Sequence, residues 1–327
     1  MQTPLPSTLL EAVHQFADPQ VAHDFFARLR FPNGVACPRQ GCGSADVATI
    51  KGRNAWRCRE CKRHFSVKVG TIFEASPIGF DKWLPAMWLL SANRNGHSSC
   101  ELARGLGVTQ KTAWFMLHRI REAMRTQSFE KLAGEVEVDE TYVGPTGRSL
   151  ARYGDTAKKA RGPVYRKTIV MGFRERSGKT RAFVVKDTKK ETLLSKVVES
   201  VAPGATIYTD ALGSYHDLRH SYAHEVINHA EEYVRGRVHT NGIENFWGVL
   251  KRTIGGTYIC PRPFHLDAYL DEQIFRFNER ESKDGSRFMR AAKGANGRRL
   301  TYKTLTQLHP LWRLKPGRKV LSPAYKP

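Results

Sequence analysis

The sequence predicts a multi-domain α+β protein, and three observations along the chain support that fold class. Four of the six cysteines lie in two close pairs within residues 37–61. A helical stretch with a glycine-containing break follows at 98–124. From residue 131 onward, runs rich in Val, Ile and Tyr alternate with runs of helical spacing. These changes divide the chain into four segments, with bounds 1–75, 76–130, 131–282 and 283–327.

The charge balance of the chain is strongly basic. Its 327 residues, enough for two or three compact units, include 53 Lys and Arg against 31 Asp and Glu, a net charge of +22. Half of this excess lies in residues 283–327, which carry twelve Lys and Arg but one acid. The alternative is that the positive charge only keeps the protein soluble, but a charge with that role need not be concentrated in one segment. We therefore expect a polyanionic partner, and nucleic acid is the first candidate.

No apolar run approaches the length of a membrane-spanning helix. Such a helix needs about 18–20 apolar residues, and the best stretch, Trp83–Ala92, is short and contains Pro85. The N-terminal residues lack the basic start and the small-residue cleavage site of a secretory signal. We expect a cytoplasmic protein without a membrane partner.

The first segment carries a metal-ligand pattern. The cysteines fall as Cys37-x4-Cys42 and Cys58-x2-Cys61, with fifteen residues between the pairs. Two close pairs on tight turns bring four thiolates to one tetrahedral Zn²⁺, and four ligands make the ion structural. Two disulfides are the alternative, but they belong to secreted proteins. We expect a zinc ribbon with one structural Zn²⁺, whose basic surroundings favour contact with DNA.

The second segment has the pattern of a helix-turn-helix. Ser98 or Ser99 is placed to cap a first helix, Gly107 starts the break, and Thr109 is placed to cap a second helix. A plain helical hairpin packed on a neighbouring domain is the alternative reading. The high positive charge favours DNA binding. The residues expected to contact DNA lie on the second helix: Gln110, Lys111, Thr112 and Arg119.

The third segment has the element order of a ribonuclease-H-like α/β domain with a mixed sheet. Three strands are predicted first, and the second and third form a hairpin around residues 176–179. A helix, two further strands and a last helix follow. Strand order within the sheet does not follow from the sequence. The predicted elements are "GEVEVDETYVG", "KTIVMGFRE", "TRAFVVKD", "KKETLLSKVVESV", "GATIYTD", "AHEVINH" and "NGIENFWGVLKRTI".

Three acids occupy positions in this segment where chemistry is expected. Asp139 lies opposite the valine face of the first strand, Asp210 ends the fourth strand, and Glu244 begins the last helix. In a ribonuclease-H-like sheet the first and fourth strands are neighbours and the last helix crosses beside them. Clustered carboxylates repel one another unless cations lie among them, and hard oxygen ligands suit two Mg²⁺ or Mn²⁺ ions. The alternative is that each acid is isolated, with Glu244 only favouring the positive helix end.

Three blocks then resemble a known family. "VEVDETYVG", "YTDALGSY" and "HTNGIENFWGVLKRTIGGTY" look like the catalytic blocks of the D-D-E insertion-sequence transposases of the ISXO-like group. The resemblance extends over roughly residues 20–280, because this family also has an N-terminal zinc ribbon followed by a helical region. It implies metal-dependent cleavage of double-stranded DNA at element ends and strand transfer into target DNA. It further implies terminal inverted repeats as the bound sites, a homo-oligomer on DNA and a bacterial, nucleoid-associated location.

The resemblance assigns Asp139 as the first catalytic acid and Asp210 as the second. The third position stays open, because members of the group use glutamate, asparagine or histidine there, and Glu244, Asn241 and His239 lie within six residues. Glu244 has the charge that a metal favours, while Asn241 is also placed as a helix N-cap. We expect Asp139, Asp210 and Glu244 to bind Mg²⁺, with Asn241 as the rival of Glu244.

Basic residues surround this expected site. Lys251 follows Glu244 by two helical turns, so the two side chains share a helix face. We expect Lys251 and the adjacent Arg252 to contact DNA phosphates. Glu140 points to the other strand face and is treated as secondary. A basic loop at 144–167 and a disordered basic tail at 283–327 are further predicted DNA contacts, with a merely solvated loop as the alternative.

Two other functions stay open at this level. A transposase-derived DNA-binding regulator without catalysis is the first, although a regulator has no need of three acids at these positions. A metal-dependent nuclease that cuts DNA without joining it is the second.

Overall fold

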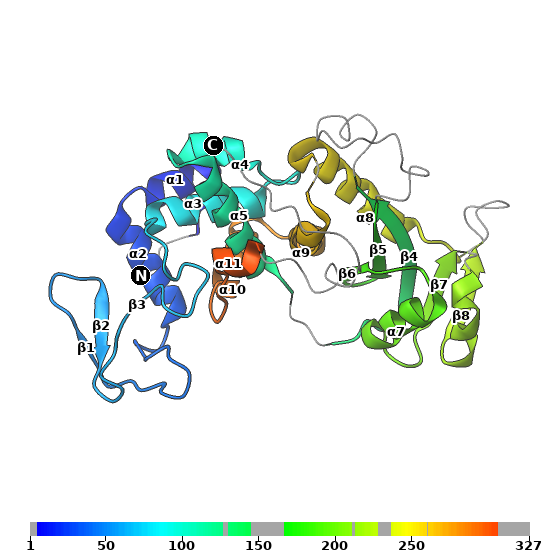
Figure 1. Cartoon of the computed structure of the whole chain (residues 1–327), viewed down its shortest axis with the longest axis horizontal. Coiled ribbons are helices and arrows are strands. Elements are labelled where there is room, and N and C mark those ends of the chain that lie inside the picture. Colours follow the sequence, from blue (N-terminus) through cyan, green and yellow to red (C-terminus); the bar gives the residue numbers. More distant parts are fainter. Residues whose placement is uncertain are drawn as a thin grey trace, which may run out of the picture.

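The computed structural model describes residues 5–126, 130–144, 167–210, 213–227, 237–259 and 261–306. A three-stranded cysteine module and a helical unit lie at one end of the molecule, and a five-stranded sheet with its helices lies at the other (Figure 1). Most of the predicted loop at 144–167 and the last part of the predicted tail lie outside the described residues. Within the described ranges, every helix is too short or too polar to cross a membrane.

The cysteine module is a small antiparallel sheet. Strands β1 (Val47–Thr49), β2 (Ala55–Cys58) and β3 (His64–Ser66) pair in that order. Trp56 stacks on Phe65 with ring centroids 5.7 Å apart. The buried core of this module consists of Phe65 and two of the cysteines, Cys37 and Cys58. So small a core leaves a bound metal as the main stabilising element.

The helical unit buries one aromatic core. It is built from α1 (Leu9–Phe16), α2 (Pro19–Arg30), α3 (Phe80–Ala92), α4 (Ser99–Leu106), α5 (Gln110–Met124) and α10 (Asp284–Gly294). Trp83, Trp88 and Phe288 are almost completely buried within it. The N-terminal helices α1 and α2 thus pack with α3 rather than with the cysteine module alone.

Helix α10 corrects the expectation of a basic tail from residue 283. Phe288, Ala291, Ala292 and Ala295 are fully buried in the helical core. Their spacing of three and four residues makes an apolar helix face, which the many Lys and Arg of the segment obscured. Where α10 meets α5, a Cβ on Gly294 would lie 2.2 Å from the Ala123 carbonyl oxygen, so the close contact requires glycine. A short helix, α11 (Tyr302–Thr306), follows.

The turn between α4 and α5 has the predicted capping residues. Ser98 and Glu101 form a reciprocal capping box at the start of α4. Gly107 ends that helix with φ of 60°, the left-handed conformation that glycine adopts without strain. Thr109 then caps α5 by accepting a hydrogen bond from the Thr112 N–H. The helix-turn-helix-like geometry is therefore encoded locally.

The large sheet is mixed and has the strand order β6-β5-β4-β7-β8. Strands β4 (Glu135–Val143), β5 (Thr168–Glu175) and β6 (Thr180–Val185) are antiparallel. Strands β7 (Thr206–Asp210) and β8 (Ala223–Ile227) extend the sheet in parallel from β4. The first and fourth strands of the segment are therefore neighbours, which confirms the ribonuclease-H-like fold.

Helices cover both faces of this sheet. Val136 and Val138 pack with α7 (Lys190–Ser200) and with the 3-10 helix η2 (Gly213–His220). On the opposite face lie α8 (Asn241–Thr253) and α9 (Leu266–Asn278), joined through η3 (Ile254–Tyr258) and η4 (Pro263–His265). The apolar side of α8 consists of four buried residues, Ile243, Phe246, Trp247 and Leu250.

Two contacts place these helices in the molecule. Gly172 on β5 makes room for α8, because a Cβ there would lie 2.5 Å from the Trp247 ring. Glu272 on α9 is fully buried and accepts a hydrogen bond of 2.6 Å from Arg121 Nε on α5. Tyr258 and Arg276 donate to the same carboxylate. The sheet unit and the helical unit are thus joined by a buried charged network.

Candidate active site and zinc centre

The two aspartates predicted to be catalytic lie at neighbouring positions of adjacent strands. Strands β4 and β7 pair in parallel up to Glu137 opposite Tyr208. Asp139 and Asp210 each follow two residues later, so strand alternation directs them to the same face. Burial and the negative charge of Asp210 raise the pKa of Asp139 to about 6. The negative charge of Asp210 therefore acts on Asp139.

Helix α8 approaches the same face of the sheet. Trp247 Nε1 donates a hydrogen bond of 2.9 Å to Asp139 Oδ2. Glu244 lies three residues earlier on this helix, and its charge also raises the pKa of Asp139. The structure thus brings Asp210 and Glu244 within electrostatic reach of Asp139. This is the setting in which a divalent cation would relieve the repulsion.

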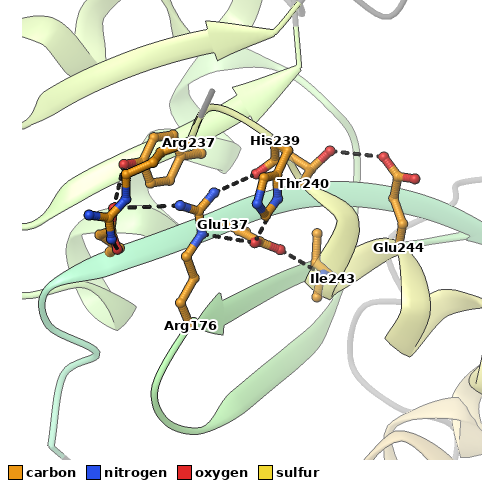
Figure 2. Close-up of polar contacts among 9 residues, drawn as sticks. Glu137, Arg176, Arg237, His239, Thr240, Ile243 and Glu244 are labelled. Atoms are coloured by element: carbon orange, nitrogen blue, oxygen red, sulfur yellow. Dashed lines mark hydrogen bonds and ion pairs between the residues drawn. The ribbon is translucent and has the colours of Figure 1, made fainter. Parts of the chain in front are cut away.

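The three acids do not form a tight ligand shell in this structure. Glu244 is exposed, and its Oε1 accepts a hydrogen bond of 2.9 Å from Thr240 Oγ1 (Figure 2). Over the described ranges, the four cysteines form the group of potential ligands whose donor atoms all lie within 4.8 Å of one another.

Asn241 and His239, the alternatives to Glu244 as third metal ligand, lie in different surroundings. Asn241 is the first residue of α8 and is exposed, while Thr240 occupies the N-cap position. His239 Nδ1 lies 3.4 Å from Glu137 Oε1, and the His239 carbonyl accepts a hydrogen bond of 3.0 Å from Arg176 Nη2. His239 is therefore held beside Glu137. Glu244 as the third ligand stays a prediction, supported by its effect on Asp139.

A fourth acid lies close to the pair. Burial raises the pKa of Glu140 to about 8, and the charges of Asp139 and Asp210 act in the same direction. Its Oε1 is buried and makes no hydrogen bond with the described residues. Strand alternation places it with Val138, on the face opposite Asp139, as expected from the sequence. A neutral carboxyl group explains how it tolerates this position.

Sequence reasoning missed the residues that hold α8 against β4. From the sequence, helical spacing indicates only an apolar face for Trp247, and strand alternation indicates only a strand face for Glu137. Glu137 Oε2 in fact accepts a hydrogen bond of 2.9 Å from the Ile243 N–H, and Arg176 Nε donates to Glu137 Oε1 at 3.1 Å (Figure 2). The available signal was that Glu137 shares the strand face of Asp139.

The predicted DNA-contacting residues divide into two groups. Lys251 and Arg252 on α8 are exposed, as are Gln110 and Lys111 at the start of α5. Thr112 is half-buried, with its hydroxyl bonded to Thr109. The exposed side chains are accessible to a phosphate backbone, and their contact with DNA stays a prediction.

Arg119 differs from its predicted role. It is 5% exposed, and its Nε donates a hydrogen bond of 3.1 Å to the Leu300 carbonyl. Its guanidinium also lies over the Phe115 ring, 4.3 Å from the centroid. Arg119 lies more than two turns after the start of α5. At this position the helix directs its side chain toward the C-terminal segment around Leu300. The side chain therefore binds protein backbone, which argues against a contact with DNA.

The four cysteines have the geometry of a zinc site. Cys37 Sγ lies 3.8 Å from Cys61 Sγ, and Cys42 Sγ lies 3.7 Å from Cys58 Sγ. Sulfurs about 2.3 Å from a tetrahedral Zn²⁺ would be about 3.8 Å apart. The Cys61 N–H lowers the pKa of the Cys58 thiol to about 7, whereas burial raises that of the Cys37 thiol to about 12, so Cys58 is the cysteine most ready to supply the thiolate that zinc requires. The residues therefore fit a structural zinc ion.

Comparisons with known proteins match the two parts of the chain that contain these residues. Residues 131–278 match the family model of the ISXO2-like transposase domain, and residues 18–64 match that of a transposase zinc-ribbon domain. An "uncharacterized transposase-like protein" of Haemophilus influenzae is 36% identical over 106 residues, which cover 32% of this chain and 85% of the relative. An "uncharacterized protein in transposable element ISH50" of Halobacterium salinarum is 26% identical over 253 residues, covering 73% of this chain and 84% of the relative.

One solved structure is also similar. The match to a chain of a pre-cleavage Mos1 transpososome covers 64% of this chain and 74% of that chain, with 14% sequence identity and a TM-score of 0.27. A similarity of this size supports no conclusion about the site.

Proposed function

Because this chain belongs to the ISXO2-like transposase family, we propose that it cleaves DNA at the ends of an insertion sequence and joins those ends to target DNA. The proposal depends above all on one observation. Asp139 and Asp210 lie at neighbouring positions on one face of adjacent strands, and α8, which carries Glu244, is bonded to Asp139 through Trp247. Such a cluster has no structural benefit without a cation.

Divalent cations are the cofactor that these residues fit. Asp139, Asp210 and Glu244 would hold one or two Mg²⁺ or Mn²⁺ ions through carboxylate oxygens. When bound, the ions supply the positive charge that activates the attacking oxygen and stabilises the leaving oxygen of a phosphodiester. The protein contributes orientation, since Trp247 holds one oxygen of Asp139. It also contributes exposed cations, Lys251 and Arg252, that would bind the DNA backbone beside the acids.

The zinc ribbon and the helix-turn-helix-like unit would bind the inverted repeats at the element ends. Gln110 and Lys111 are exposed at the N-terminus of α5, the part of a recognition helix that contacts bases and phosphates. The net charge of +22 supplies the sequence-independent attraction to DNA. Joining two element ends requires both to be held together, so we propose a homo-oligomer on DNA.

A joining assay tests the proposed reaction. The purified chain is incubated with labelled DNA from an element end, a target plasmid and Mg²⁺, beside Asp139→Ala and Asp210→Ala. Joined products that disappear in both variants are expected. Cleaved but unjoined DNA would instead support the nuclease. Binding of end DNA without any metal-dependent product would support a DNA-binding regulator and contradict the enzyme.

The third ligand has its own test. Glu244→Gln removes the charge without changing the size of the side chain, and Asn241→Ala is the rival variant. We expect Glu244→Gln to abolish joining while Asn241→Ala retains it. The reverse result would assign the third position to Asn241.

A further inference from the structure

Glu137 is a buried carboxylate that touches the first turn of α8 from another element. It lies on β4 and is 1% exposed. Its Oε2 accepts a hydrogen bond of 2.9 Å from the Ile243 N–H, and its Oε1 accepts one of 3.1 Å from Arg176 Nε (Figure 2). His239 Nδ1 lies 3.4 Å from the same Oε1. Two cationic or polar partners and one helix N–H thus surround a single strand carboxylate.

The helix lacks the usual cap at this end. The first N–H groups of an α-helix have no partner within the helix, and an N-cap side chain usually binds one of them. Thr240 occupies the N-cap position of α8 but makes no side-chain cap bond, and its hydroxyl donates to Glu244 Oε1. Glu137 supplies the missing acceptor from the strand. Its negative charge also complements the positive end of the helix dipole.

The sequence is adapted to this close approach. A Cβ on Gly242 would lie 2.7 Å from Glu137 Oε2 and 3.1 Å from the Arg174 side chain. Any residue larger than glycine would therefore displace either the Glu137 carboxylate or the start of the helix. This constraint is independent of the hydrogen bonds and points to the same contact.

Two residues of one strand face consequently hold α8. Glu137 binds the Ile243 N–H, and Asp139 accepts the hydrogen bond of Trp247 one helical turn later. Glu244 lies between these two points, directly after Ile243. Both the rotation and the distance of α8 relative to β4 are therefore determined near the acids. The position of Glu244 relative to Asp139 depends on them.

We propose that Glu137, held by Arg176, is a positioning residue that orients α8 so that Glu244 and Asp139 can bind the same metal site. Arg176 balances the buried charge, since it also stacks on Tyr208 at 4.1 Å from the ring centroid and donates to the His239 carbonyl. This inference rests on the proposed function, because it assumes that Glu244 and Asp139 act on one cation. A purely structural ion pair would stabilise the fold without affecting metal binding.

Glu135 offers a matched control on the same strand face. It lies two residues before Glu137, and its Oε1 is 3.5 Å from Arg176 Nη1. Its other bonds go to Arg237 and to the Tyr208 hydroxyl. None of these contacts reaches the first turn of α8. Glu135→Ala therefore removes a carboxylate from the same network while leaving the helix cap intact.

The experiment compares the full-length wild type with Glu137→Ala, Glu137→Gln and Glu135→Ala. Hydrogen exchange of the Ile243 amide reports the cap, and Mn²⁺ titration, with and without end DNA, reports the metal site. We expect Glu137→Ala to lose protection at Ile243 and to need about tenfold more Mn²⁺, a typical effect of residues that orient ligands. Glu137→Gln keeps an acceptor for the Ile243 N–H and should fall between this variant and the wild type.

Binding of end DNA is measured in parallel to exclude global unfolding. It should be retained in all variants, because the zinc ribbon and the helical unit do not contact Glu137. Glu135→Ala should keep both the Ile243 protection and the Mn²⁺ requirement. Equal changes in Glu135→Ala and Glu137→Ala, or an unchanged Mn²⁺ requirement in Glu137→Ala, would overturn the positioning role.

The outcome is separable from that of the proposed function. A wild-type chain that binds Mn²⁺ through Asp139 but forms no joined or cleaved DNA would contradict the enzyme, while the Mn²⁺ titrations still decide the role of Glu137. A wild-type chain whose Mn²⁺ binding does not change in Asp139→Ala would overturn both proposals together.

Discussion

The indole of Trp247 and the carboxylate of Asp139 are joined by a hydrogen bond of 2.9 Å between α8 and β4. This contact holds one oxygen of the first acid at a defined place. It also fixes the position of α8, the helix that carries Glu244 and Lys251, relative to β4. An aromatic residue that belongs to the core by its burial thus contributes directly to the candidate active site.

Trp247→Phe should lower the rate of DNA cleavage about tenfold without loss of DNA binding. The phenyl ring keeps an aromatic group in the apolar face of α8, although it lacks the indole atoms Cζ2 and Cη2 that lie against Gly172. The N–H that orients Asp139 is lost as well, and removal of such partners typically costs about 10–100-fold. The rate is measured at saturating Mg²⁺ with labelled end DNA. Phe246→Leu, a packing change on the same helix without a bond to Asp139, is the control and should have the smaller effect.

Zinc removal should unfold the ribbon and weaken binding to element ends. The ribbon has little hydrophobic core, so the metal–thiolate bonds supply much of its stability. We expect one zinc per chain by elemental analysis and less than one after Cys58→Ser. Cys100→Ser is the matched control, because Cys100 is exposed and outside the cluster. Full zinc content in Cys58→Ser would contradict the four-cysteine site.

Asp271 should make the stability of the protein fall as pH rises through neutrality. Burial raises the pKa of this carboxyl group to about 7 from an ordinary value of 3.8, and Asp267 and Glu122 act in the same direction against Arg125. The folded state therefore binds the proton more tightly than the unfolded state does. The resulting stability is complete below about pH 4 and is lost as pH rises through about 7.

Asp271→Asn mimics the protonated form at every pH. At pH 8 this variant should melt at a higher temperature than the wild type. Its unfolding free energy should be larger by about 1–2 kcal/mol after solvent screening. At pH 4 the two proteins should melt together. Glu281→Gln, which removes an exposed carboxylate, should show no such pH dependence.

Lys111 and Arg119 should differ in their effects on DNA binding, although both lie on α5. Lys111 is exposed, so Lys111→Ala should weaken binding to all sequences and reduce the slope of log affinity against log salt by about one. Arg119 donates to the Leu300 carbonyl and is buried. Arg119→Ala should instead lower the melting temperature while leaving the salt slope unchanged. A reduced salt slope in Arg119→Ala would show that the arginine does contact DNA.

Local features of the chain could be predicted because their causes are local. The capping box joins Ser98 to Glu101, and the N–H of the left-handed Gly107 bonds to Ala103, so each feature spans at most four positions. The spacing of the cysteine pairs predicts a tetrahedral site in the same local way. Helix α10 was missed because its apolar stripe, which includes Phe288 and Ala292, is masked by surrounding charges. Its burial depends on α3 and α5, more than 150 residues earlier in the chain.

By itself, the sequence determined the type and order of the elements of the sheet unit up to α8, the cysteine cluster that fits a zinc site, and the strand positions of Asp139 and Asp210. These properties follow from the alternation of side chains, capping chemistry and ligand spacing, which act over a few residues. Only the tertiary structure decided that β4 lies beside β7, and that Glu137 and Trp247 together set the orientation of α8. Those contacts join residues more than 70 positions apart, and their geometry exists only when the sheet and the helix pack against each other.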